Sequence, residues 1–141
     1  MLENFYAGDK TLIAEQWEST GDLESARFVK ARADFSLHLE PDWFDDLVAA
    51  VCRSTQSPSM GRVDVLIEQL AGDGEGSSAD VVSPTFVKLV ADLSGPQLKS
   101  VAKDWLGNEL TDDATAALAE FVRLCGVATV ENLPVVHTWS M

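Results

Sequence analysis

Apolar residues recur at spacings of three and four along much of the chain, a pattern typical of amphipathic helices. The clearest example follows Glu40-Pro41, where proline suits a first helical turn. Its apolar positions are Phe44, Leu47, Val48, Val51 and Cys52. The same reasoning predicts four more helices, which run from about Ser59 to Gly72, from Ser83-Pro84 to about Leu93, from Ser94 to Gly107-Asn108, and from Thr111 past Cys125.

The first third of the chain and its C-terminal end complete the predicted fold. Helical spacing predicts two short helices at 12–21 and 23–33. Residues 35–39 and 135–139 instead alternate or are rich in β-branched and aromatic side chains, so we expect two strands that can pair with each other. The predicted architecture is therefore mainly α, an α+β domain spanning 1–141 with several helices and a minor two-stranded β element.

Charge is the feature that departs most from average globular composition. Ten Lys and Arg stand against 23 Asp and Glu, which gives a net charge of −13. Between Asp34 and Asp80 there are ten acidic residues and only Arg53 and Arg62, a local net charge of −8. Direct nucleic-acid binding is disfavoured, because it depends on cations that neutralise phosphates. A basic protein partner fits this charge.

Signals for export or membrane insertion are missing from the sequence pattern. Residues 1–6 lack a basic start and a following apolar stretch, and the longest apolar run, 47–52, is far shorter than the roughly 20 residues of a membrane span. Cys52 and Cys125 each stand alone within a helical pattern, which favours buried thiols over a disulfide framework. We therefore expect a cytoplasmic protein that makes no membrane contact.

Carboxylates and one tryptophan are the candidate partner-binding residues. Three of the carboxylates fall in one predicted helical turn and two in a glycine-rich loop, and the indole follows the proline of the same helix. The set is Asp42, Trp43, Asp45, Asp46, Asp73 and Glu75. Three other roles remain open for these side chains: carboxylates in a first turn complement the helix dipole, excess acid maintains solubility, and clustered carboxylates can carry out acid and base chemistry. For the tryptophan, closure of the core is the alternative to contact with a partner.

The sequence carries no diagnostic catalytic, cofactor or metal motif. The segment 72–78 is glycine-rich, but Asp73 and Glu75 would repel phosphate and no Lys-Ser or Lys-Thr pair follows. The same segment lacks the spacing of a calcium loop. His38 and His137 lie in the two predicted strands without a third evident zinc ligand, and no Gly-x-Ser-x-Gly elbow is present. We assign no catalytic, cofactor-binding or metal-binding residue.

Two segments of the second half resemble other proteins. Residues 133–139, after a helix that carries Leu124-Cys125, look like the tail of small uncharacterised bacterial proteins. Residues 82–87, followed by a helix with Trp105, are similar too. The resemblance covers the last 60 or so residues and implies a bacterial origin but no activity.

Three functions remain as hypotheses. The first is an acidic protein-interaction module, an inhibitor or immunity-type protein that binds a basic partner. The second is a small enzyme that uses His38 or His137 with a nearby carboxylate, which requires both groups in one pocket. The third is a structural or regulatory subunit that self-associates through a helical face.

Overall fold

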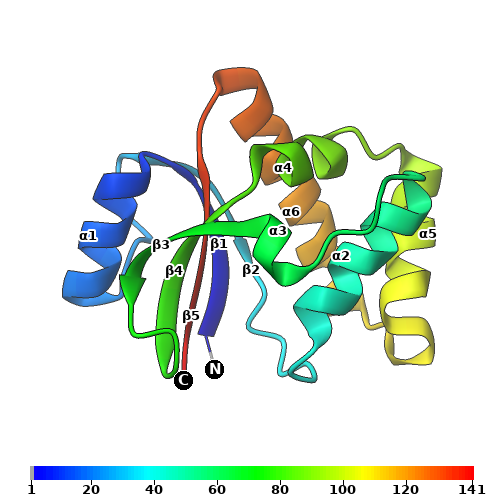
Figure 1. The fold of residues 1–141 in the computed structure, drawn as a ribbon, viewed down its shortest axis with the longest axis horizontal. Helices are drawn as coiled ribbons and strands as arrows, with labels where there is room; N and C mark the ends of the chain where they lie inside the picture. The colour runs from blue at the N-terminus through cyan, green and yellow to red at the C-terminus, as the bar shows by residue number, and fades with distance from the viewer. Residues whose placement is uncertain (1) are drawn as a thin grey trace.

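A five-stranded antiparallel sheet forms the centre of the molecule. The computed structural model describes residues 2–141, and the strands run in the order β2-β1-β5-β4-β3 (Figure 1). The strands are β1 (Leu2–Gly8), β2 (Val29–Asp34), β3 (Leu66–Gly72), β4 (Ser77–Val82) and β5 (Val135–Ser140). The strands β1 and β5 pair with each other inside the sheet, with Leu2 opposite Ser140, so the start of β1 and the end of β5 lie at the same end of the sheet (Figure 1).

Helices cover both faces of this sheet. They are α1 (Lys10–Thr20), α2 (Trp43–Ser54), α3 (Arg62–Val65), α4 (Pro84–Ala91), α5 (Gly95–Leu106) and α6 (Asp112–Glu131), with a 3-10 turn η1 (Gly107–Glu109). Helix α1 lies on one face alone, whereas α6 packs on β1 and β2 from the other face, where α4 packs on α6 and α5 on α2 (Figure 1).

Alternation along the central strands sends side chains into two apolar clusters. Phe5 and Ala7 of β1 join the large cluster under α2, α4, α5 and α6. Tyr6, which lies between them in sequence, joins a smaller cluster with Ile13 and Ala14 of α1. Strand β1 is therefore buried on both faces, and such strands lose the polar alternation that identifies half-buried ones.

The prediction of a mainly α, all-alpha fold with a minor two-stranded element is wrong. The structure is an α+β fold with five strands. The predicted strand at 135–139 is present as β5, but its neighbours are β1 and β4. Residues 35–39 form no strand, so the predicted pair does not exist.

Two predicted helices contain strands instead. The predicted helix at 59–72 is the short α3 followed by β3, and Gly72 begins the β3–β4 turn with a φ of 89° instead of ending a helix. A Cβ at Gly72 would lie 2.5 Å from the Ser77 carbonyl oxygen, so glycine is required at this close approach. The predicted helix at 23–33 contains β2, the edge strand beside β1.

Capping residues placed the other helices correctly. The Thr111 side chain accepts a hydrogen bond from the Ala114 amide, and Ser94 and Gln97 form a reciprocal capping box at the start of α5. Gly21 ends α1 in the left-handed conformation with a φ of 72°. Ser94, Thr111 and Gly21 are signals local in sequence, which is why the sequence alone located these three helix ends.

Within residues 2–141, none of the helices combines the length and the apolar character that crossing a membrane requires.

Candidate functional site

A small pocket lies where α2 begins and α5 ends. Its volume is about 180 Å³, and we call it the acidic pocket. Three carboxylates, two indoles, one imidazole and two leucines line it. These residues are His38, Leu39, Glu40, Trp43, Asp46, Trp105, Leu106 and Glu109. The described residues that line the pocket include three acidic side chains but neither Lys nor Arg.

Two indole hydrogen bonds fix the walls of the acidic pocket. Trp105 Nε1 donates to the Trp43 carbonyl oxygen at 3.0 Å, which ties the end of α5 to the start of α2. Trp43 Nε1 in turn donates to Glu3 Oε1 of β1 at 2.9 Å. Both tryptophans are 5% exposed, so only their edges reach the pocket. The two indoles beside the carboxylates are therefore held in place by hydrogen bonds.

The negative end of a helix dipole adds to this charge. The last turn of α5 ends at Leu106 beside the pocket, and the C-terminal end of a helix carries partial negative charge. The volume of the pocket falls below the range of about 300–1,000 Å³ that is usual for small-molecule sites. The acidic pocket can therefore hold one cationic side chain but not a larger ligand.

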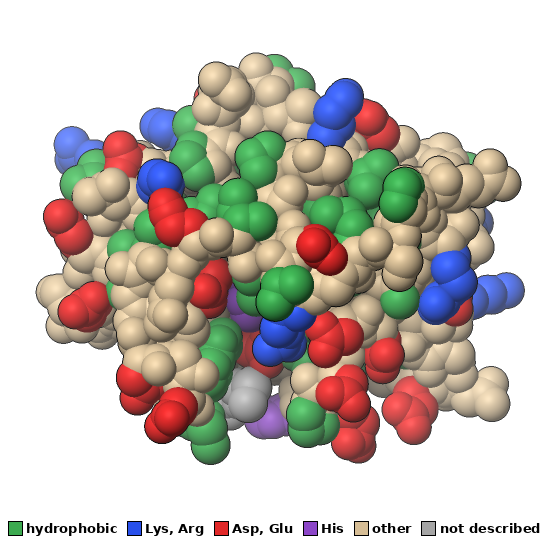
Figure 2. Space-filling model, in the orientation of Figure 1, with side chains coloured by type: hydrophobic (Ala, Val, Ile, Leu, Met, Phe, Trp, Pro, Cys, Tyr) green, Lys and Arg blue, Asp and Glu red, His purple; other side chains and the backbone are tan. Residues whose placement is uncertain are grey.

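The structure places one of the three carboxylates predicted at the start of α2 in this pocket. Asp42, Asp45 and Asp46 are all exposed, and Asp46 lines the acidic pocket. Asp45 Oδ1 lies 3.5 Å from Arg62 Nε, so part of its charge is already compensated. Figure 2 shows acidic side chains gathered along one edge of the molecule, around the start of α2 and near the β3–β4 hairpin.

The other predicted residues lie elsewhere or are less accessible than expected. Trp43 is a core residue that closes the pocket floor, so its ring is not free to anchor a partner. Asp73 and Glu75 belong to the β3–β4 turn and do not line the acidic pocket. Sequence reasoning missed Glu40, Trp105 and Glu109, because only tertiary packing brings the α2 and α5 ends together.

Asp73 has a structural role that its backbone contacts explain. Its Oδ1 accepts hydrogen bonds from the amides of Glu75 at 2.9 Å, Gly76 at 2.8 Å and Ser77 at 3.2 Å. These amides favour the charged carboxylate, the Gly76 amide most of all, and hold the pKa of Asp73 below its usual value.

This lowered pKa predicts how the hairpin responds to acid. Since the folded pKa of Asp73 is depressed, the carboxylate stabilises the turn above the unfolded-state pKa, and this stabilisation is lost as pH falls through the folded value. We expect Asp73→Ala to accelerate hydrogen exchange of the Gly76 and Ser77 amides at neutral pH. Glu75→Ala, on the same turn, is the matched control. Unchanged exchange in Asp73→Ala would contradict this role.

The two histidines lie in different surroundings. His137 Nε2 lies 3.2 Å from Glu3 Oε2, but the imidazole is 2% exposed and packs against the Phe5 and Phe44 rings at 4.8 and 5.3 Å between ring centroids. This histidine and carboxylate are therefore within hydrogen-bond reach but inside the core. A substrate could reach them only if the core opened.

His38 is exposed and lines the acidic pocket beside three carboxylates. Its φ of 56° lies in the left-handed region, which histidine tolerates better than most residues. No hydrogen bond among the described residues joins its ring to one of these carboxylates. For the enzyme hypothesis the structure therefore offers His38 in one pocket with three carboxylates, without a bond among the described residues that orients its ring.

Comparisons with known proteins give no indication of function, so the proposal below is based on the geometry of the structure. No protein-family model matches this chain, and neither a curated protein nor a solved structure shows significant similarity to it.

Proposed function

We propose that this protein binds a basic protein partner at its acidic pocket, as an inhibitor or immunity-type protein does. A Lys or Arg side chain of the partner enters the pocket and pairs with Glu40, Asp46 and Glu109. The observation that carries this proposal is the lining itself, which holds three carboxylates and, among its described residues, neither Lys nor Arg.

The walls of the pocket suit the rest of such a side chain. Lys and Arg bury their methylene stems on apolar surface and keep the charged head among polar groups. The Trp43 and Trp105 edges and Leu106 provide that surface beside the carboxylates. An Arg guanidinium gains most from this arrangement, because its planar fork can pair with more than one carboxylate oxygen.

The carboxylates around the pocket would act on the rate of association. Asp42 and Asp45 lie in the same exposed region as Asp46, and the whole chain carries a net charge of −13. Such a field speeds the encounter with a cationic protein and weakens as salt screens it. A nuclease or another nucleic-acid-binding protein has the basic surface that this site would cover. The reduced thiols of Cys52 and Cys125, both buried and unbonded, support a cytoplasmic site of action.

Neutralising the pocket is the test of this function. We expect the triple variant Glu40→Gln, Asp46→Asn and Glu109→Gln to bind fluorescein-labelled octa-arginine at least about tenfold more weakly at low salt, because three paired charges are lost. Fluorescence anisotropy measures the affinity, and the difference from wild type should shrink as ionic strength rises.

A matched control separates local pairing from total charge. Glu15→Gln, Glu24→Gln and Glu131→Gln change three exposed carboxylates away from the pocket and leave the same net charge of −10, that is −13 plus three. We expect this variant to retain nearly all the affinity. Equal losses in the two variants would show that the acidity acts only as bulk charge, and would refute the acidic pocket as the binding site.

A further inference from the structure

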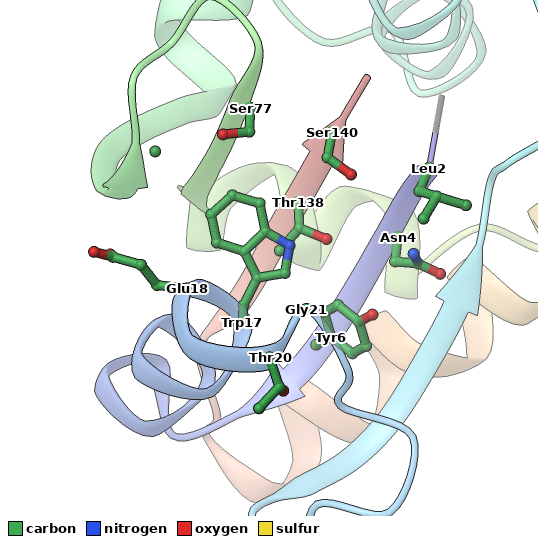
Figure 3. Close-up of a pocket in the computed structure, with 11 residues that line it drawn as sticks. Leu2, Asn4, Tyr6, Trp17, Glu18, Thr20, Gly21, Ser77, Thr138 and Ser140 are labelled. Carbon is green, nitrogen blue, oxygen red and sulfur yellow. The ribbon is translucent and has the colours of Figure 1, made fainter.

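A second and larger pocket lies on the opposite face of the sheet. Helix α1 covers only part of that face, and beside it lies a cavity of about 560 Å³, which we call the sheet pocket (Figure 3). Strands β1 and β5 form its floor, Trp17 of α1 forms one wall, and Ser77 of the β3–β4 hairpin lies at another. The proposed function makes no use of this pocket.

Strand register brings polar side chains together on its floor. Asn4 lies directly opposite Thr138 in the β1–β5 pair, and Ser140 follows two residues later on the same face. In Figure 3 the Ser140, Thr138 and Tyr6 oxygens and the Asn4 amide gather over these two strands. Under α1 the same face of the sheet is apolar, with Ala79 and Val136 packed against Ile13. The polar side chains therefore lie on the part of the sheet that α1 leaves open.

Tyr6 and Thr138 are buried at the base of the sheet pocket. Burial is the main cause that raises the pKa of Tyr6, with the nearby Asp34 carboxylate acting in the same direction. The phenol is therefore neutral at physiological pH and keeps its proton for donation.

Trp17 gives the sheet pocket an aromatic wall. The indole is half-buried and stands beside the polar floor, with its nitrogen turned toward Thr138 (Figure 3). An indole offers a flat apolar face together with one N–H donor. A ligand in this pocket thus meets an apolar surface on one side and hydroxyl and amide groups on the other.

The sheet pocket offers little charge to a ligand. Glu18 is the charged residue among its described lining, and its carboxylate points away from the floor in Figure 3. Among the described residues that line the pocket there is neither a Lys nor an Arg that could bind a phosphate or a carboxylate. A ligand of this pocket is therefore expected to be uncharged.

We propose that the sheet pocket binds a neutral carbohydrate, with one sugar ring packed on Trp17 and its hydroxyls bonded to the half-buried Asn4 and Ser140. A sugar ring combines an apolar C–H face with hydroxyls that both donate and accept, which matches the wall and the floor. Hydroxyl side chains and the amide likewise both donate and accept. The volume lies within the usual range for small-molecule sites.

Nuclear magnetic resonance of the full chain tests this assignment. The indole N–H signal of Trp17, assigned with Trp17→Phe, is followed while glucose, galactose, N-acetylglucosamine, maltose or cellobiose is added up to tens of millimolar. We expect at least one of these sugars to shift the Trp17 signal saturably and to leave the Trp105 signal unchanged. Saturable shifts would also appear for backbone amides of residues 138–140.

Variants show whether the floor and the wall both contribute. We expect Trp17→Ala, and separately Asn4→Ala with Ser140→Ala, to weaken binding of the active sugar at least about tenfold, while Leu12→Ala on exposed α1 surface leaves it unchanged. The floor variant replaces half-buried side chains, so it keeps the test valid if Trp17→Ala unfolds. No Trp17 shift with any sugar would overturn the proposal, as would tighter binding of the nucleosides uridine or adenosine.

Discussion

Replacing Phe5 with alanine should destabilise the fold by about 3–5 kcal/mol, the usual cost of removing a buried phenylalanine ring. Phe5 is fully buried in β1 and lies at the centre of an aromatic cluster. Its ring centroid is 4.3 Å from that of Phe121 and 5.3 Å from that of Phe35. The substitution therefore removes contacts that join β1 to α6 and to Phe35.

Urea unfolding followed by tryptophan fluorescence measures this loss. Small domains have total stabilities of about 5–15 kcal/mol, so Phe5→Ala should shift the midpoint strongly. Leu2→Ala is the matched control, because Leu2 belongs to the same strand but is 63% exposed. A loss below about 1 kcal/mol in Phe5→Ala would be inconsistent with a core centred on β1.

Replacing Glu3 with alanine is expected to cost about 2–4 kcal/mol, because two buried polar groups lose their partner at once. Glu3 Oε1 accepts from the Trp43 indole at 2.9 Å, and Glu3 Oε2 lies 3.2 Å from His137 Nε2. His137 Nδ1 has no hydrogen-bond partner among the described residues, so the imidazole depends on Glu3. Glu3→Gln keeps the size and one acceptor, and should cost less.

The Glu3 variants also connect stability with binding. Glu3 holds Trp43, and Trp43 holds Trp105 at the floor of the acidic pocket. We therefore expect Glu3→Ala to weaken octa-arginine binding under conditions where it remains folded, and Glu3→Gln to weaken it less. Urea unfolding and anisotropy on the same samples give both quantities. Equal stability of Glu3→Ala and wild type would contradict the buried network.

The strands escaped prediction for different physical reasons. In β2, Val29, Ala31 and Ala33 alternate with charged residues, which is a strand signal that a competing helical spacing concealed. In β3, Leu66 and Leu70 also fit a helical face, and only pairing with β4 decides between the two structures. The pairing of β1 with β5 joins the two ends of the sequence, so local spacing cannot determine it.

The candidate site shows the same division between local and long-range information. The first-turn position of Asp45 and Asp46 follows from a local helix start, and the sequence predicted it correctly. Glu109 reaches the acidic pocket only because α5 packs on α2, and Trp43 is buried because it meets Glu3 from β1. Sequence patterns therefore identified charge but not the pocket that gathers it.

The most direct test of the acidic pocket is the indole N–H signal of Trp105 during titration with acetyl-Gly-Arg-Gly-amide. Binding of one arginine in the pocket predicts saturable shifts of the Trp105 and Trp43 signals and no shift of Trp17. The neutral peptide acetyl-Gly-Gln-Gly-amide should leave all three unchanged. If the Trp105 signal does not shift, and the backbone amides that shift belong to exposed Asp and Glu residues elsewhere, arginine does not bind in the acidic pocket.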